Sequence, residues 1–145
     1  MSVLRLFLSA AVLSVSSSVA FAAIPATVYK SPTCGCCEAY IAYLNQHGFK
    51  VRAINSDDMN GIKKRLGVTP GMGSCHTVEI AGYAVEGHVP VAAIRKLLVS
   101  RPKVTGIAVP GMPQNSPGMG VEQPGALPVY TMTRDQRTDV LFGRF

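Results

Sequence analysis

The sequence has 145 residues, of which 48% are hydrophobic and 15% are charged, and its formal net charge is +6. This length suits one domain, and the composition excludes an intrinsically disordered chain. Basic residues cluster only at Lys63, Lys64 and Arg65, where a solvated helix face accounts for them, so we expect no nucleic-acid partner.

The first 22 residues have the pattern of a secretory signal peptide. Arg5 provides a positive start, residues 6–15 form a short apolar run, and Ala20-Phe21-Ala22 fits the small-x-small cleavage pattern. An uncleaved anchor or a buried strand is the alternative. We expect export and cleavage after about Ala22, which lowers the formal net charge from +6 to +5. We expect no membrane insertion of the mature chain, because no later segment is long and apolar enough to cross a bilayer.

After the signal, strand-like and helix-like patterns follow in the order β-α-β-α-β-β-α. Alternating apolar and polar residues indicate strands, and apolar residues three or four apart indicate helices. Gly48 and Gly67 end the first two helices, and Ala81-Gly82 allows a hairpin. The expected elements are a strand at 26–30, a helix at about 36–47, a strand at 49–54, a helix at 59–66, strands at 75–80 and 83–87, and a helix at 90–100.

The first helix should pack through one apolar face. Its spacing predicts that Ile41 and Leu44 are buried, with Tyr40 and Ala42 near the edges of that face.

The order of elements, with a cysteine pair where the first strand meets the first helix, indicates an α/β fold of the thioredoxin-like kind. We expect residues 1–22 to be the cleaved signal and residues 23–101 to form the thioredoxin-like domain. Residues 102–145 are then a C-terminal extension, rich in Pro, Gly and Met in its first part, that packs on the same domain. Two late strands are expected there, at 129–133 and 140–142.

Three of the four cysteines lie in the strand-to-helix turn Cys34-Gly35-Cys36-Cys37. A helix N-terminus favours the thiolate, which both attacks disulfides and binds metals. Cys34 and Cys37 are three residues apart, so a helix places their sulfurs near enough for a disulfide or for shared metal ligation. Cys36 points about 100° away from Cys37. In a thioredoxin-like fold Cys75, before the third strand, faces this turn and is the expected partner.

Clustered thiolates fit several chemistries. Two structural disulfides with no further role are one alternative. Zinc usually takes two separated Cys or His pairs, and a second CxxC is missing here. Iron–sulfur assembly is less expected outside the cytoplasm. Cu(I) accepts low coordination numbers and bridging thiolates, so the crowded sulfurs favour one or several copper ions.

A thiol–disulfide oxidoreductase is the alternative function, with Cys34 as the nucleophile and Cys37 as the resolving thiol. Thioredoxins carry a proline opposite the CxxC turn, but here the corresponding place holds Gly73-Ser74-Cys75. The chain also contains no Trp. Both departures disfavour this alternative.

Methionines could add thioether ligands. Met112 and Met119 stand seven apart in a Gly/Pro-rich loop rather than at helical core spacing, and Met72 precedes Cys75. Gap-filling packing is the alternative for each.

Two histidines could add nitrogen ligands. His76 adjoins Cys75, but side chains alternate along a strand, so the two face opposite sides unless the strand starts later. His88 precedes the last helix. A hydrogen-bonded structural role is the alternative for both.

Several motifs occur together between about residues 26 and 120. They are Cys34-Gly35-Cys36-Cys37, Gly73-Ser74-Cys75-His76-Thr77, Gly82-Tyr83, Val85-Glu86-Gly87-His88-Val89-Pro90, and Ala108-Val109-Pro110-Gly111-Met112-Pro113 with Ser116-Pro117-Gly118-Met119. In combination they resemble the CopG-type periplasmic copper-resistance proteins.

This resemblance implies a thioredoxin-like fold, a periplasmic location and a role in copper tolerance. It also implies interconversion of Cu(I) and Cu(II), the activity of a copper oxidoreductase. The partners would be copper ions and other periplasmic copper-handling proteins. The implied copper ligands are Cys34, Cys36, Cys37 and Cys75, with Met112, Met119, His76 and His88 as further ligands. Residues 121–145 take no part in the resemblance.

Overall fold

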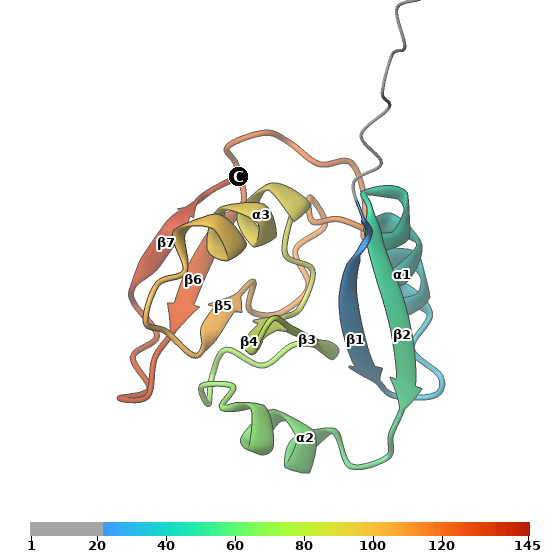
Figure 1. Cartoon of the computed structure of the whole chain (residues 1–145), viewed down its shortest axis with the longest axis horizontal. Helices are drawn as coiled ribbons and strands as arrows, with labels where there is room; N and C mark the ends of the chain where they lie inside the picture. Colours follow the sequence, from blue (N-terminus) through green and yellow to red (C-terminus); the bar gives the residue numbers. More distant parts are fainter. Residues whose placement is uncertain (1–21) are drawn as a thin grey trace, which may run out of the picture.

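A seven-stranded sheet organises residues 22–145, the part of the chain that the computed structural model describes (Figure 1). The elements are β1 (Ile24–Lys30), α1 (Gly35–Gln46), β2 (Phe49–Asn55), α2 (Met59–Leu66), β3 (His76–Ile80), β4 (Tyr83–Glu86), α3 (Val91–Ser100), β5 (Gly106–Ala108), β6 (Pro128–Met132) and β7 (Leu141–Arg144). No helix in this range is both long and hydrophobic enough to cross a bilayer. The expected signal peptide lies, apart from Ala22, outside the described residues.

The order of strands across the sheet is β2-β1-β3-β4-β5-β6-β7. β1 and β2 run parallel across the α1 crossover, and β4 and β5 run parallel across α3. The other neighbouring strands are antiparallel, including the expected Ala81-Gly82 hairpin between β3 and β4. Lys30, at the end of β1, pairs with His76, at the start of β3. This register places the cysteine turn beside the segment that leads into β3.

The mixed α/β class and the element order β-α-β-α-β-β-α are confirmed. The two late strands also form, as β6 and β7. The sequence pattern does not reveal β5, because its three residues are too few to show alternation. Since β5, β6 and β7 extend the same sheet, the C-terminal extension adds strands to the first part of the fold. The thioredoxin-like assignment and the division at residue 101 stay predictions.

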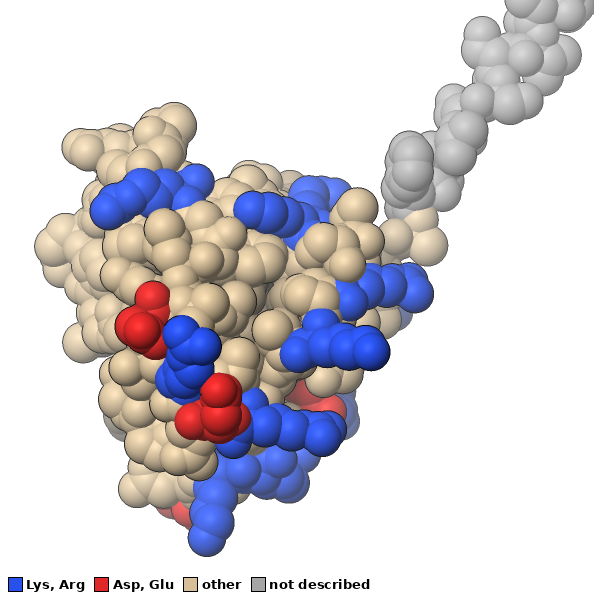
Figure 2. Space-filling view, turned by 90° about the vertical axis from the view of Figure 1, so that its left-hand side faces the viewer, with Lys and Arg blue, Asp and Glu red and all other residues tan. Residues whose placement is uncertain are grey.

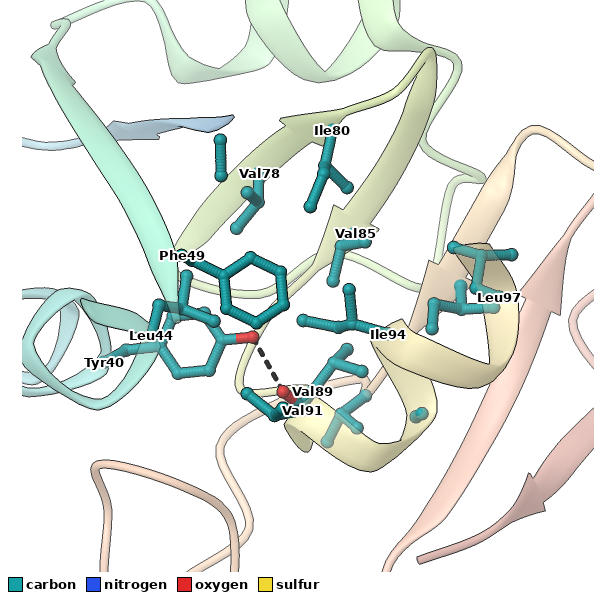
Figure 3. Packing of buried hydrophobic residues seen from close by; sticks show 14 of the residues in the cluster. Tyr40, Leu44, Phe49, Val78, Ile80, Val85, Val89, Val91, Ile94 and Leu97 are labelled. Carbon is teal, nitrogen blue, oxygen red and sulfur yellow. Dashed lines mark hydrogen bonds between the residues drawn. The ribbon is translucent and has the colours of Figure 1, made fainter. Parts of the chain in front are cut away.

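The main core lies between one face of the sheet and the helices α1 and α3. Figure 3 shows side chains from both helices converging on the apolar residues of the strands. This cluster includes Val28, Tyr40, Leu44, Phe49, Val78, Ile80, Val85, Val89, Ile94, Leu97, Ile107 and Val129. Because its buried members come from α1, α3 and the strands β1 to β6, burial of this core ties the cysteine turn to most of the sheet.

The expected packing face of α1 is wrong by about one residue. Tyr40 is fully buried, whereas Ile41 is only half-buried. Tyr40 and Leu44 are four apart and therefore share the inner face. The Tyr40 hydroxyl donates to the Val89 carbonyl at 2.7 Å, so this large side chain is buried without an unpaired polar atom (Figure 3).

A second, smaller cluster lies on the opposite face of the sheet. It contains Met72, Ala84, Ala108 and Met132. Ala84 and its neighbour Val85 belong to different clusters because successive strand residues point to opposite faces. Met72 is 1% exposed among these apolar neighbours, which is the packing role rather than a ligand role.

Candidate metal centre

The cysteine turn stands at the N-terminus of α1, as expected. Cys34 is the N-cap residue in an extended conformation, and no side chain caps the helix. Cys36 and Cys37 belong to the first helical turn, where backbone N–H groups are free and favour negative charge. Cys34 and Cys37 form a disulfide with their Cα atoms 5.4 Å apart, so the predicted proximity of these two sulfurs is confirmed.

Cys36 and Cys75 are the free thiols of the described chain, and they face each other. The Cys36 sulfur lies 3.7 Å from the Cys75 sulfur and 3.5 Å from the Cys34 sulfur. All four cysteine sulfurs lie within 4.8 Å of one another. The expectation that Cys75 approaches the turn, and that Cys36 meets it, is therefore confirmed.

Both histidines that were candidates reach Cys75. The Cys75 sulfur lies 3.2 Å from His76 Nδ1 and 3.2 Å from His88 Nε2. His76 can turn toward its neighbour because β3 begins at His76, so Cys75 stands outside the strand and its alternation. These three residues form a second group of potential ligands, and Cys75 belongs to both groups.

Hydrogen bonding fixes the role of the His88 ring. Its Nδ1–H donates to the Pro117 carbonyl at 2.7 Å, which leaves the Nε2 lone pair facing the Cys75 sulfur. Burial lowers the pKa of His88, and burial together with His88 and Lys63 lowers the pKa of His76 to about 3. Both rings are therefore neutral at physiological pH, the state in which imidazole binds a metal.

The Cys75 thiol is held protonated in the absence of a metal. Burial, followed by the hydrogen bond and the charge of Cys36, raises the pKa of Cys75 to about 11. A metal ion that binds this sulfur must displace its proton. Nε2 of His76 is buried and has no hydrogen-bond partner among the described residues.

A buried carboxylate supports the segment that carries Cys75. Glu86 is fully buried, and its Oε1 accepts from the Ser74 backbone N–H at 2.6 Å, while Oε2 accepts from Thr77 Oγ1 at 2.6 Å. Lys63 Nζ forms an ion pair with Oε1 and donates to Thr77 Oγ1 at 3.1 Å. Burial raises the pKa of Glu86, whereas these three donors act in the opposite direction.

Sequence reasoning missed this support. Lys63 belongs to the basic cluster that was interpreted as a solvated helix face, but its side chain is only 16% exposed and pairs with Glu86. That interpretation is wrong for Lys63. The available signal was Glu86 at the end of an otherwise apolar strand, because a carboxylate at such a position needs a cation or several donors.

A second buried charge braces the cysteine turn itself. Lys30 is 2% exposed, and its Nζ lies 2.8 Å from Glu38 Oε1 and donates to the Ser31 carbonyl at 3.2 Å. These contacts join the end of β1 to the first turn of α1. Residues 34–37 therefore lie between Ser31 and Glu38, the two residues that Lys30 contacts.

The loop at residues 109–120 carries Met112 and Met119, and we call it the methionine-bearing loop. It lies against the site at two places. The Ser74 hydroxyl donates to the Gly111 carbonyl, and the Pro117 carbonyl accepts from His88. Met112 is 53% exposed and Met119 is half-buried, so both stay candidate ligands.

The loop also packs closely on α1. At Gly118, with φ +77°, an added Cβ would lie 2.9 Å from the backbone nitrogen of Tyr40. Only glycine fits both this conformation and this approach.

Taken together, the site offers two kinds of donor set around one shared thiol. One consists of the four cysteine sulfurs, of which those of Cys34 and Cys37 are joined in a disulfide. The other combines the Cys75 sulfur with two neutral imidazole nitrogens. Thiolates suit soft metals and thiol–disulfide exchange, whereas imidazole also suits harder divalent ions.

Comparison with known proteins gives a family match and two structural matches. The family described as "Protein of unknown function, DUF411" matches residues 72–119. No curated protein matches the chain significantly. Two solved structures, titled "Copper resistance protein copG- Form 1" and "Form 2", are each 42% identical to the chain, with a TM-score of 0.75. Each match covers 85% of this chain and 98% of the other.

Proposed function

This chain belongs to the family of the copper resistance protein CopG, and we propose that it binds copper through its four cysteines and contributes to copper tolerance. The observation that carries the proposal is the convergence of four sulfurs within 4.8 Å of one another. Soft thiolates at this density are typical ligands of Cu(I). Family membership and the apparent secretory signal support a periplasmic location.

Reduced protein is the form proposed to capture Cu(I). In the disulfide form Cys34 and Cys37 are consumed by their bond, and two thiols remain. Reduction would release two more thiols at the same place, enough for bridging thiolates around more than one ion. Met112 and Met119, on the loop that contacts Ser74 and His88, are proposed as further ligands.

The proposal extends to conversion between Cu(I) and Cu(II). Oxidation of the Cys34 and Cys37 thiols to the disulfide yields two electrons and two protons, which would reduce two Cu(II) ions to two Cu(I) ions. The group formed by Cys75, His76 and His88 supports this step, because imidazole nitrogens favour Cu(II) more than a sulfur-only set does. The disulfide form keeps this mixed group intact.

An anaerobic titration of the reduced protein with Cu(I), in competition with a chromophoric chelator, tests the binding proposal. We expect uptake of at least one ion per chain. Cys36→Ser and Cys75→Ser should each reduce the stoichiometry or weaken the affinity by at least about tenfold, because a thiolate ligand is lost. Ser100→Ala, which removes an exposed hydroxyl on α3, serves as the control and should bind like the wild type. Failure to compete with a weak chelator would contradict the proposal.

A thiol–disulfide oxidoreductase is the second candidate function, and the disulfide between Cys34 and Cys37 specifically favours it. Such an enzyme should reduce insulin with Cys34 as nucleophile, and the Cys36→Ser, Cys75→Ser double variant should keep this activity. A copper protein should lose copper stoichiometry in the same variant and leave insulin intact. One variant and two assays therefore separate the functions.

A further inference from the structure

Two neighbouring surface cavities lie side by side, one of them lined in part by residues of α2 and the loop that follows it. One, of about 570 Å³, is lined by Lys64 and the loop at residues 67–71, and the other, of about 830 Å³, is lined by Lys103. They share Thr105, Thr133 and Arg134 in their walls. We call the two cavities together the basic groove.

The charge of the basic groove is mainly positive. Lys64, Lys103 and Arg134 are exposed and form no ion pair within residues 22–145. Lys63 also lines the groove, but Glu86 balances its charge. Asp135 is the one acidic residue in the lining. Figure 2 shows lysine and arginine side chains predominating over the lower part of this side of the molecule.

Unpaired polar groups also lie along the groove. Thr69 is 1% exposed, and its hydroxyl has no hydrogen-bond partner among the described residues. Within the same part of the chain, the backbone N–H groups of Gly71 and Gly73 donate to no protein acceptor. Thr69, Gly71 and Gly73 all line the cavity that contains Lys64. Gly71 and Gly73 are exposed, so their N–H groups add accessible hydrogen-bond donors to the positive charge. This combination suits an occupant rich in carboxylate and carbonyl oxygens.

We propose that the basic groove binds an extended, acidic segment of a partner protein. Lys64 lines only one cavity and Lys103 only the other, while Arg134 lines both. A single small anion would therefore leave part of the positive lining unmatched, whereas acidic side chains spaced along a peptide can meet all three cations. Free backbone N–H groups can pair with the peptide's carbonyl oxygens, as in other modes of extended-peptide recognition.

The groove includes a residue that lies close to Cys75 in the sequence, which indicates a role for peptide binding. Gly73, in its wall, is followed directly by Ser74 and Cys75. A bound segment would hold the partner beside the cysteine site, where a metal ion could pass between the two proteins. The peptide-binding proposal itself rests on charge and shape alone, so it can succeed or fail independently of copper binding.

An NMR titration tests the proposal. The probe is octaglutamate, added to the ¹⁵N-labelled exported protein, with octalysine as the negative control. We expect shift changes concentrated at residues 60–73, 103–105 and 133–136, and weaker binding at higher salt. The variant K64E/R134E should bind about tenfold less tightly, because two attractive contacts become repulsive.

The matched control is K50E/R52E, which makes the same change in net charge at two exposed positions on β2. It should keep the affinity within about twofold of the wild type. Equal loss in both double variants, or shift changes scattered over the surface, would overturn the proposal, because the attraction would then be non-specific. The proposal would also be overturned if an oligothymidylate of eight nucleotides bound more tightly than octaglutamate, because the groove would then be a nucleic-acid surface.

Discussion

Cys75 is the residue on which the two donor sets of the site depend. Its sulfur has a thiol neighbour on one side, in Cys36, and imidazole nitrogens on the other, in His76 and His88. Burial raises the pKa of Cys75 to about 11, so at neutral pH it is a protonated, weakly reactive thiol. A metal that replaces this proton would be held at the boundary between a sulfur-rich and a nitrogen-containing environment.

Glu86 holds this thiol in place through the backbone of Ser74. A buried carboxylate is costly unless donors surround it, and Glu86 has Lys63, Thr77 and the Ser74 N–H. We predict that Glu86→Gln lowers the free energy of unfolding by about 2–4 kcal/mol, because it leaves Lys63 largely buried without its counter-ion. Urea unfolding of the disulfide form measures this change.

The exposed pair of Glu79 and Arg65 provides the control for this prediction. Its atoms are 3.9 Å apart and its side chains are 40% and 53% exposed, so Glu79→Gln should cost less than about 1 kcal/mol. The amide of Glu86→Gln keeps only one acceptor oxygen for the donors of Ser74, Thr77 and Lys63, so the hold on Ser74 should weaken. Alkylation of Cys75 by iodoacetamide in the absence of denaturant should then be faster in this variant. Equal stability and equal alkylation rates in the two variants would contradict a positioning role.

At the scale of elements, the methionine-bearing loop is fixed to α1 by a contact that only glycine permits. We predict that Gly118→Ala displaces residues 109–120, because the added Cβ would lie 2.9 Å from Tyr40 N. The left-handed conformation alone should cost about 1–2 kcal/mol, and the clash should add to this. The measurement is thermal unfolding together with the ¹⁵N shifts of the His88 ring, which report its bond to Pro117.

The variant Gly125→Ala separates the two causes of destabilisation, which are the left-handed conformation and the clash with α1. Gly125 has a φ of +75°, but nothing lies within 4 Å of an added Cβ. This variant should show the cost of the left-handed conformation while the His88 ring signals stay unchanged. If Gly118→Ala behaves in the same way as Gly125→Ala, the loop is not held by its contact with α1.

Local patterns predicted most of the elements but not the contacts between them. Residue periodicity and turn residues placed β1 to β4 and all three helices within a few residues. The cysteine spacing predicted that Cys34 and Cys37 meet, and the expected arrangement of elements predicted that Cys75 meets Cys36. Tyr40 was misplaced because helical periodicity cannot rank two neighbouring apolar residues without the partner surface. β5 is three residues long, and its pairing with β4 depends on contacts that the sequence does not display.

The polar part of the site was harder to predict for the same reason. The contact of His76 with Cys75 depends on β3 beginning one residue later than the pattern indicated. The pairing of Lys63 with Glu86 joins α2 to β4 over 23 positions of sequence. Lys63 does not show this relation locally, since a basic helix residue is usually solvated, and Glu86 indicates a need for donors without indicating which residues provide them.

At the scale of the whole molecule, one sheet with a core on each face carries both the site and the groove. Cys75 precedes β3, His76 begins it and His88 follows β4, so these candidate ligands lie at one end of the hairpin. The basic groove approaches the same end through Gly73. The cysteine turn after β1 completes the site, because β1 pairs with β3 in the register of Lys30 with His76.

Stability of the whole fold should fall with acid because of the buried imidazoles. The pKa of His76 is lowered to about 3 in the folded protein, mainly by burial, compared with an ordinary value of 6.5 in the unfolded chain. Between these values the unfolded chain binds a proton that the folded protein excludes. The free energy of unfolding therefore decreases as pH falls from about 6.5 toward 3, by up to about 1.4 kcal/mol per pH unit for this group.

Urea unfolding of the metal-free disulfide form at pH 7, 6, 5 and 4 measures this dependence. His76→Gln removes the group that the unfolded chain protonates, so its stability should fall less steeply with acid than that of the wild type, even if it is less stable at pH 7. His47→Gln removes an exposed imidazole at the end of α1 and serves as the control for the loss of an imidazole that is not buried. A wild-type slope in His76→Gln would mean that carboxylates, rather than the buried ring beside Cys75, govern acid unfolding.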